Sequence, residues 1–314
     1  MSSTYLIFGN GFIATHLALD ILKKEKSVNV VGHKNINENI PKSIQIKGCN
    51  HIPEIENLLR KINPDYIFLT QGISFIPSTE RDLERSVQAN LMAPLKVLET
   101  TYNLAQAGQI DVKKIITFGS AAEYGDGGAQ AFSEDTPVNP SSIYGLSKYW
   151  LYQLSQFYAH LEIPCVHVRQ FNTIGIYQSP MFVLSSFCRQ LALIEKGKHK
   201  AVLEVGDLTQ KRDFIDIRDA VDAYHLVIKK ATIGSVVNVC TGQSKEVTDL
   251  ITHLKEIAKV SFDVKVNNKF IAAKRTRNTV LSGKPTILKG WGWMPKYGIE
   301  ESIEWVLNDW RTKV

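Results

Sequence analysis

The sequence has few cysteines and no long hydrophobic stretch. Its four cysteines, at positions 49, 165, 188 and 240, are widely spaced and form no Cys-x-x-Cys pair, which argues against a zinc site or a disulfide framework. The amino terminus has no basic segment followed by an apolar one, and no window has the length of a membrane span. We therefore expect reduced, buried thiols, no bound metal, no membrane attachment and a cytoplasmic location.

Low-complexity linkers and internal repeats are also missing. Of the 314 residues, 44% are hydrophobic and 22% are charged, a composition that excludes disordered, collagen-like and coiled-coil proteins. The 37 Lys and Arg residues against 31 Asp and Glu residues leave a net charge of +6, which indicates nucleic acid only weakly and suits an anionic small ligand equally well. We expect a folded protein of one large domain or two closely packed ones.

Short apolar runs alternate with amphipathic segments from the first residues onward. The pattern predicts strands at 5–8, 28–31, 44–46, 66–70, 115–118 and 165–168, with helices at 12–24, 52–62, 83–107 and 142–161. Beyond residue 171 the rhythm loosens, with helices expected at 182–195, 219–229 and 247–258 and strands at 202–205 and 236–240. This order indicates an α/β fold with a Rossmann-type doubly wound parallel sheet and a smaller C-terminal α/β substrate domain. We expect the Rossmann domain at 1–171 plus about 213–258, and the smaller domain at 172–212 plus 259–314.

Residues 9–14 read Gly-Asn-Gly-Phe-Ile-Ala and connect the first predicted strand to the first predicted helix. This is the setting of a Gly-x-Gly-x-x-Gly/Ala dinucleotide loop. Gly9 permits the tight turn, Gly11 lets main-chain amides approach a pyrophosphate, and Ala14 allows close packing of helix on strand. The loop predicts a bound dinucleotide, and the alternative is an ordinary loop with two turn glycines.

The second predicted strand ends without the carboxylate that usually binds the ribose 2′-hydroxyl of NAD. His33 and Lys34 follow it instead, and both side chains suit a 2′-phosphate. This favours NADP(H) over NAD(H), with an ordinary solvated loop lysine as the alternative for Lys34.

Tyr144 and Lys148 lie four residues apart near the start of a predicted helix, which places them on one face. We expect the ammonium of Lys148 to lower the phenol pKa from about 10, so that Tyr144 can exchange a proton with an alcohol or ketone. Ser120 follows a predicted strand, at the edge where parallel sheets place their ligands. We expect its hydroxyl to bond the same substrate oxygen, and the alternative is a simple turn serine.

Together these residues resemble the extended short-chain dehydrogenases/reductases, the sugar-nucleotide epimerase/dehydratase family. The resemblance covers essentially the whole chain and includes 70–72, Asn90 and 169–172. Stretches 178–183 and 205–216 are most similar to GDP-4-keto-6-deoxymannose reductases, and 290–295 resembles the closing Gly-Trp-x-Pro element of the family. Three features depart from the family pattern: a shorter glycine loop, Gln170 in place of the common proline, and Cys49-Asn50 where an acid usually faces the adenine.

The resemblance implies a role for each matching residue. It implies catalysis by Ser120, Tyr144 and Lys148. It implies cofactor binding by Gly9, Asn10, Gly11, Phe12, Ile13, His33, Lys34, Cys49, Asn50, Leu69, Thr70, Gln71, Asn90, Tyr144 and Lys148. It implies substrate binding by Ser120, Asn172, Val183, Arg212 and Arg275, with Arg277 as the alternative to Arg275 at the diphosphate.

The residues between Ser120 and Tyr124 predict which reaction is catalysed. Ala121 and Ala122 stand where the 4,6-dehydratases carry an acidic pair or a glutamate, and Ala122 stands where the fucose-synthase type has a cysteine. An alanine cannot transfer a proton. Glu123 is a poor substitute, because neighbouring side chains on an extended segment point in opposite directions. The resemblance and these alanines predict an NADPH-dependent reductase of the 4-keto group of a nucleotide-diphosphate 4-keto-6-deoxy sugar.

Two alternatives stay open beside this reading: an NAD-dependent sugar-nucleotide 4-epimerase and a non-catalytic dinucleotide-binding protein. GDP is favoured by resemblance alone, with the dTDP, UDP and CDP nucleotides as alternatives, and the sequence leaves the stereochemistry of the product open. The excess of positive charge gathers between Leu254 and Arg277, next to the expected diphosphate ligands, so phosphates can account for it without nucleic acid, and the alternative is an ordinary solvated face. We also expect a homodimer through the apolar faces of 83–104 and 151–161, with ordinary core packing as the alternative.

Overall fold

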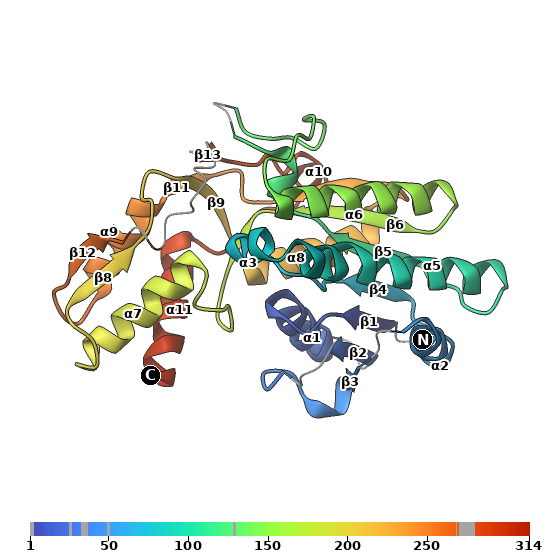
Figure 1. Ribbon diagram of the computed structural model, residues 1–314, viewed down its shortest axis with the longest axis horizontal. Helices are drawn as coiled ribbons and strands as arrows, with labels where there is room; N and C mark the ends of the chain where they lie inside the picture. Colours follow the sequence, from blue (N-terminus) through green and yellow to red (C-terminus); the bar gives the residue numbers. More distant parts are fainter. Residues whose placement is uncertain are drawn as a thin grey trace. The chain divides into compact units, whose positions relative to one another are not determined.

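A seven-stranded sheet in the order β10-β6-β5-β4-β1-β2-β3 organises the amino-terminal part of the chain in the computed structural model (Figure 1). The structure describes residues 3–24, 27–32, 37–48, 51–127, 130–267, 269 and 280–314. Each neighbouring pair from β3 to β6 is parallel, which is the strand order of a Rossmann-type sheet. The strands are β1 (Thr4–Phe8), β2 (Ser27–Gly32), β3 (Gln45–Lys47), β4 (Tyr66–Leu69), β5 (Lys114–Phe118), β6 (Cys165–Gln170) and β10 (Val236–Val239).

Apolar strands packed under amphipathic helices form the core of this part. Leu6, Ile67 and Ile115 from three neighbouring strands are fully buried in one cluster with Leu59 and Leu98. The expected helix 83–107 is present but contains a π-helical segment at Gln88–Met92. The helical elements are α1 (Phe12–Lys24), η1 (Lys42–Ile44), α2 (Ile52–Ile62), α3 (Ile76–Arg81), α4 (Leu83–Val87), α5 (Ala93–Gln106), η3 (Ala121–Tyr124), α6 (Ile143–His160) and α8 (Ile217–Lys230).

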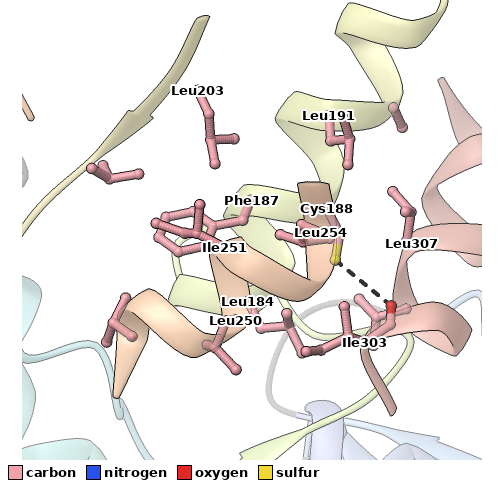
Figure 2. Packing of buried hydrophobic residues seen from close by; sticks show 14 of the residues in the cluster. Leu184, Phe187, Cys188, Leu191, Leu203, Leu250, Ile251, Leu254, Ile303 and Leu307 are labelled. Atoms are coloured by element: carbon pink, nitrogen blue, oxygen red, sulfur yellow. Dashed lines mark hydrogen bonds between the residues drawn. The ribbon is translucent and has the colours of Figure 1, made fainter. Parts of the chain in front are cut away.

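The second part of the chain has its own small sheets and its own core. The strand β9 (Lys211–Asp216) pairs with β7 (Asn172–Ile174), β11 (Ser244–Glu246) and β13 (Val280–Leu281), and β8 (Val202–Val205) pairs with β12 (Asp263–Val266). Leu184, Leu191, Leu250 and Leu307 meet in a buried cluster, where the thiol of Cys188 lies 4.0 Å from the main-chain oxygen of Ile303 (Figure 2). The helices of this part are α7 (Val183–Glu195), α9 (Val247–Ile257), α10 (Thr286–Gly290) and α11 (Ile299–Lys313).

The chain divides into two compact units. The first comprises Met1–Glu123, Val138–Gln170 and Val221–Val237, and the second comprises Tyr124–Pro137, Phe171–Ala220 and Asn238–Val314. The expected Rossmann domain included 124–137, 171, 213–220 and 238–258, which belong to the second unit instead. The physical reason at 247–257 is that α9 buries its apolar face in the cluster of α7 and α11.

The predicted doubly wound sheet is confirmed, and most expected strands and helices match within a few residues. Cys165, Cys188 and Cys240 are free and buried, as expected, while Cys49 lies outside the described residues. Among the described residues, no helix combines the length and the apolar character that crossing a membrane requires.

Candidate active site

The glycine loop follows β1 and has two glycines with different surroundings. Gly9 has a φ of +110°, and a Cβ there would lie 2.5 Å from Oγ1 of Thr70 and 2.8 Å from the main-chain nitrogen of Gln71. A side chain at this position would therefore collide with the loop after β4 as well as strain the main chain. A Cβ on Gly11 would meet nothing within 4 Å, so the main chain is open on that side.

The side chain of Asn37, which the sequence did not indicate as part of the site, holds this loop in place. The side-chain nitrogen of Asn37 donates to the main-chain oxygen of Asn10 at 2.5 Å and lies 2.9 Å from Oγ1 of Thr15. Oγ1 of Thr15 donates in turn to the main-chain oxygen of Gly11 at 2.8 Å. The sequence carries no signal for Asn37 beyond its place after β2. The predicted cofactor residues His33, Lys34, Cys49 and Asn50 lie outside the described residues.

The loop after β4 and the π-helical segment meet at Asn90. Its Oδ1 accepts the main-chain N–H of Ile73 at 2.6 Å, and its Nδ2 donates to Oγ of Ser147 on α6 at 2.9 Å. A Cβ on Gly72 would lie 2.7 Å from Oδ1 of Asn90 and 3.3 Å from Nζ of Lys148. The structure thus brings the predicted residues Asn90 and Lys148 to one glycine of the 70–72 loop.

Helix α6 places Tyr144 and Lys148 on successive turns. The helix begins where the side chain of Ser142 accepts the N–H of Gly145 at 3.0 Å, a common N-terminal cap. Gly145 packs so closely on the turn after β5 that a Cβ there would lie 2.4 Å from the main-chain oxygen of Ala122. This contact brings the start of α6 to the turn that carries Ser120.

The three predicted catalytic side chains come together at this point. Ser120 lies close enough to Tyr144 for its hydroxyl to lower the pKa of the phenol. Nζ of Lys148 donates to the main-chain oxygen of Phe118, at the end of β5, at 2.8 Å. Lys148 and Ser120 are buried, whereas Tyr144 keeps part of its surface exposed.

The pKa values of Tyr144 and Lys148 are both shifted, and that of Tyr144 is shifted in the direction opposite to the one expected. Burial raises the pKa of Tyr144 to about 12, the hydrogen bond from Ser120 opposes the rise, and the charge of Glu123 adds to it. The expected lowering of the Tyr144 pKa is therefore not found in this structure, where burial outweighs any effect of Lys148. Burial lowers the pKa of Lys148 itself to about 8, with Glu123 opposing the fall. The site thus pairs a protonated phenol with a lysine that titrates close to neutral pH.

Glu123 is fully buried beneath the turn, and its carboxylate faces β6. Oε1 accepts the main-chain N–H of Ser120 at 2.7 Å and lies 3.1 Å from Nε2 of His167, and Oε2 accepts from Nε of Arg169 at 3.1 Å. Burial alone would raise the pKa of Glu123, but His167 and Arg169 hold it below its usual value. The sequence indicated only that Glu123 is a poor proton-transfer group. Its structural role has a local signal, because Ser-x-x-Glu at 120–123 is the pattern of a capping box.

The predicted substrate residues of the second unit lie on separate elements. Asn172 is exposed at the start of β7, and Val183 is exposed at the start of α7. Arg212 lies in β9, where its Nη1 donates to the main-chain oxygen of Lys211 at 2.8 Å and its Nη2 donates to Oε1 of Gln210 at 2.6 Å. Arg275, like its alternative Arg277, lies outside the described residues.

Asp213, next to Arg212, anchors β9 and was not predicted. Its Oδ1 accepts from the main-chain nitrogen of Thr241 at 2.9 Å and from Oγ1 of Thr241 at 2.7 Å, and its Oδ2 accepts the N–H of Gly242 at 2.9 Å. Burial raises the pKa of this carboxyl group in spite of these donors. The strand that carries Arg212 is therefore fixed to the turn at 241–242.

The first unit fits a dinucleotide in two independent respects. The main chain at Gly11 is open, and α1 begins directly after it without an acidic residue in its first turn, which suits a phosphate at the helix N-terminus. Oε1 of Gln71 is buried and has no hydrogen-bond partner among the described residues, so it can accept a hydroxyl or amide of a ligand.

Comparison with known proteins places this chain in a family. The model of the NAD dependent epimerase/dehydratase family matches residues 5–240, and the chain belongs to this family. GDP-6-deoxy-D-mannose reductase of Pseudomonas aeruginosa is 30% identical over 253 residues, which cover 80% of this chain and 82% of the relative. GDP-6-deoxy-D-talose 4-dehydrogenase of Aggregatibacter actinomycetemcomitans is 26% identical over 268 residues, covering 84% and 82%.

Solved structures agree on the fold. The structure of RMD from Pseudomonas aeruginosa complexed with NADPH matches with a TM-score of 0.84 at 24% identity, covering 99% of this chain and 100% of the other. UDP-glucose 4-epimerase of Thermus thermophilus in complex with NAD matches with a TM-score of 0.85 at 22% identity and the same coverage. The predicted family and fold class are confirmed. The relatives support an oxidoreductase of the short-chain dehydrogenase/reductase type.

Proposed function

We propose that the protein is an NADPH-dependent reductase of the 4-keto group of a nucleotide-diphosphate 4-keto-6-deoxy sugar, with GDP as the preferred nucleotide. The observation that carries this proposal is the turn after β5. Ala121 and Ala122 have no group that transfers a proton, and the carboxylate of Glu123 is buried against His167 and Arg169. Ser120 and Tyr144 are then the side chains that can hydrogen-bond and protonate a single oxygen of the substrate. Dehydration or epimerisation at other carbons needs a further acid or base.

Bound NADPH would supply the hydride that reduces C4. Tyr144 donates a proton to the C4 oxygen, and a pKa of about 12 keeps the phenol protonated and ready to donate at neutral pH. The hydroxyl of Ser120 hydrogen-bonds the same oxygen and polarises the carbonyl. Lys148, on the next turn of α6, stabilises the phenolate that proton donation leaves behind.

The cofactor would be held by residues of the glycine loop and of the loop after β4. Main-chain amides beside Gly11 suit the pyrophosphate, and the buried Oε1 of Gln71 suits a hydroxyl or amide donor. His33 and Lys34 would bind the 2′-phosphate. Asn172, Arg212 and Arg275 would bind the substrate diphosphate, with Val183 beside the nucleotide. The 30% identity to a GDP-6-deoxy-D-mannose reductase supports GDP as the nucleotide.

The proposal is tested by following NADPH oxidation with a panel of 4-keto-6-deoxy sugars linked to GDP, dTDP, UDP and CDP. We expect rapid oxidation with the GDP-linked sugar, slower oxidation with the other nucleotides, and one reduced product whose configuration at C4 is read by NMR. A purified protein that carries tightly bound NAD and interconverts sugar nucleotides without consuming NADPH would instead be a 4-epimerase. Dinucleotide binding without turnover of any substrate would favour the non-catalytic alternative.

We also propose a homodimer formed through α5 and α6. An apolar hollow on this face of the first unit is lined by Leu91, Leu95, Trp150, Gln153, Leu154 and Phe157. Trp150 and Phe157 are 37% and 57% exposed, which is unusual for two large apolar side chains on one helix face. Sedimentation should give a dimer for the native protein and a monomer for Trp150→Glu. A native monomer at micromolar concentration would contradict the proposal.

A further inference from the structure

The turn that carries Ser120 is fixed by reciprocal hydrogen bonds between residues 120 and 123. The main-chain N–H of Ser120 donates to Oε1 of Glu123 at 2.7 Å, and the N–H of Glu123 donates to the main-chain oxygen of Ser120 at 3.0 Å. Oγ of Ser120 accepts the N–H of Ala122 at 3.2 Å. Because this N–H uses only a lone pair of Oγ, the hydroxyl proton stays available as a donor.

Glu123 is in turn fixed to the sheet by side chains of β6. Nε of Arg169 lies 3.1 Å from Oε2 and Nε2 of His167 lies 3.1 Å from Oε1, and all three side chains are buried. Nδ1 of His167 lies 2.8 Å from Oγ1 of Thr117 on β5, so the ring has a defined orientation. The ring of Tyr152 on α6 closes the cluster, 5.0 Å from the Arg169 guanidinium and 5.4 Å from the His167 ring.

No space is left between Gly119 and this cluster. A Cβ on Gly119 would lie 2.1 Å from Oε1 of Glu123 and 2.1 Å from Nε2 of His167. The main chain between β5 and Ser120 therefore rests directly on the Glu123–His167 pair. A shift of this pair would move the hydroxyl of Ser120, and small displacements of a reacting group cost large factors in rate.

We propose that Glu123 is a positioning residue of the active site: its carboxylate, anchored by His167 and Arg169, holds the main chain of Ser120 so that the serine hydroxyl stays directed at Tyr144. This inference rests on the proposed function only in placing Ser120 and Tyr144 at the reacting oxygen. Glu123 has a second effect, because its charge favours the cationic form of Lys148. The groups that face the carboxylate are the Ser120 N–H, His167 and Arg169. Its negative charge also raises the pKa values of Tyr144 and Lys148 on α6.

The test compares Glu123→Gln with Glu195→Gln as a matched control. Glu195 is also a shielded glutamate, since its carboxylate accepts from Arg311 at 2.7 and 2.8 Å and from the main-chain N–H of Lys259 at 3.0 Å, but it lies in the second unit. Both variants should lose stability. For Glu123→Gln alone we expect kcat to fall about 10- to 100-fold while the Kd for NADPH changes less than about 3-fold. The basic limb of its pH–rate profile should also move to lower pH, because Lys148 loses a nearby negative charge.

A double-variant cycle separates positioning from a general loss of stability. If Glu123 acts through the serine hydroxyl, the Glu123→Gln change should cost little further activity in a Ser120→Ala background. Losses that multiply or an unchanged kcat would each overturn the proposal, and an unmoved basic limb would overturn the effect of Glu123 on Lys148. Arg169→Lys is the second variant in case Glu123→Gln does not fold, with a smaller loss of kcat in the same direction.

The cycle also distinguishes this inference from the proposed function. It can be measured with whichever sugar nucleotide the protein converts, including a 4-epimerase reaction, in which case the proposed function fails and the inference is tested unchanged. If no substrate is converted, amide hydrogen exchange tests whether Glu123 holds the main chain of Ser120. Exchange of the Ser120 amide should accelerate in Glu123→Gln and stay unchanged in Glu195→Gln, and equal protection in both variants would overturn the proposal.

Discussion

The hydroxyl of Tyr224 on α8 donates a hydrogen bond of 2.5 Å to Oε1 of Gln170 at the end of β6, and both side chains are buried. The Tyr224 ring also meets the edge of Phe118 at 5.0 Å between ring centres. The proline that the family commonly has at position 170 offers no side-chain acceptor. Gln170 is therefore matched to a buried phenol on the helix that covers it.

Removal of this phenol should destabilise the first unit. We expect Tyr224→Phe to lower the free energy of unfolding by about 1–2 kcal/mol, because a buried amide oxygen loses its donor. Urea unfolding measures this, with Tyr149→Phe on the partly exposed face of α6 as the control. A second change, Gln170→Leu, should cost less in the Tyr224→Phe background than alone. Equal stability of Tyr224→Phe and the native protein would contradict the pairing.

The two glycines of the dinucleotide loop should respond differently to the same substitution. Gly9→Ala should lower the melting temperature, because its Cβ would lie 2.5 Å from Thr70 Oγ1 at a φ of +110°. Gly11→Ala should leave the melting temperature unchanged, since a Cβ there meets nothing within 4 Å. It should nevertheless weaken NADPH binding by about 10-fold or more, because the methyl group fills the approach to the pyrophosphate. Undiminished NADPH affinity in Gly11→Ala would place the cofactor elsewhere.

The pH dependence of the reaction should follow Lys148. Its pKa of about 8 means that the ammonium loses its proton as the pH rises through that value, so kcat/KM for ketone reduction should fall above pH 8. The phenol of Tyr144, with a pKa of about 12, should add no second limb in the measurable range. Lys148→Arg should move the limb above about pH 10, because a guanidinium keeps its proton there. A basic limb near neutral pH that persists in Lys148→Arg and is lost in Tyr144→Phe would contradict this assignment.

Loss of the phenol should abolish chemistry and leave cofactor binding intact. We expect Tyr144→Phe to lower kcat by about 100- to 10,000-fold, the usual contribution of a general acid. NADPH affinity, measured by fluorescence, should stay within about 3-fold of the native value. Tyr149→Phe removes a phenol from the same helix and should reduce neither quantity. A turnover in Tyr144→Phe like that of the native protein would remove Tyr144 from the mechanism.

Hydropathy predicted the strands and helices whose buried residues are mainly apolar, such as β1, α1 and α2. It missed β9, because this strand reads Lys-Arg-Asp-Phe-Ile-Asp and buries Asp213 and Asp216 against donors that come from distant residues. The short α3 was also missed, since its six residues are too few to show a period.

The candidate site was predictable where spacing along the chain determines geometry. The Tyr144–Lys148 pair lies on one helix, and Ser120 follows a strand, so sequence alone indicated both. The Glu123 cluster depends on the parallel register of β5 and β6, which brings Thr117 beside His167, and no local pattern encodes that pairing. The raised pKa of Tyr144 could not be predicted from the sequence either, because it follows from burial in the folded protein.

The most direct test of the central claim is the transfer of label from NADPH deuterated at the nicotinamide C4 position on the transferred side. With a GDP-linked 4-keto-6-deoxy sugar, the proposal predicts one NADPH oxidised per sugar and one deuterium at C4 of the product, observed by NMR. Sugar-nucleotide conversion without net NADPH oxidation, or a product without deuterium at C4, would contradict it.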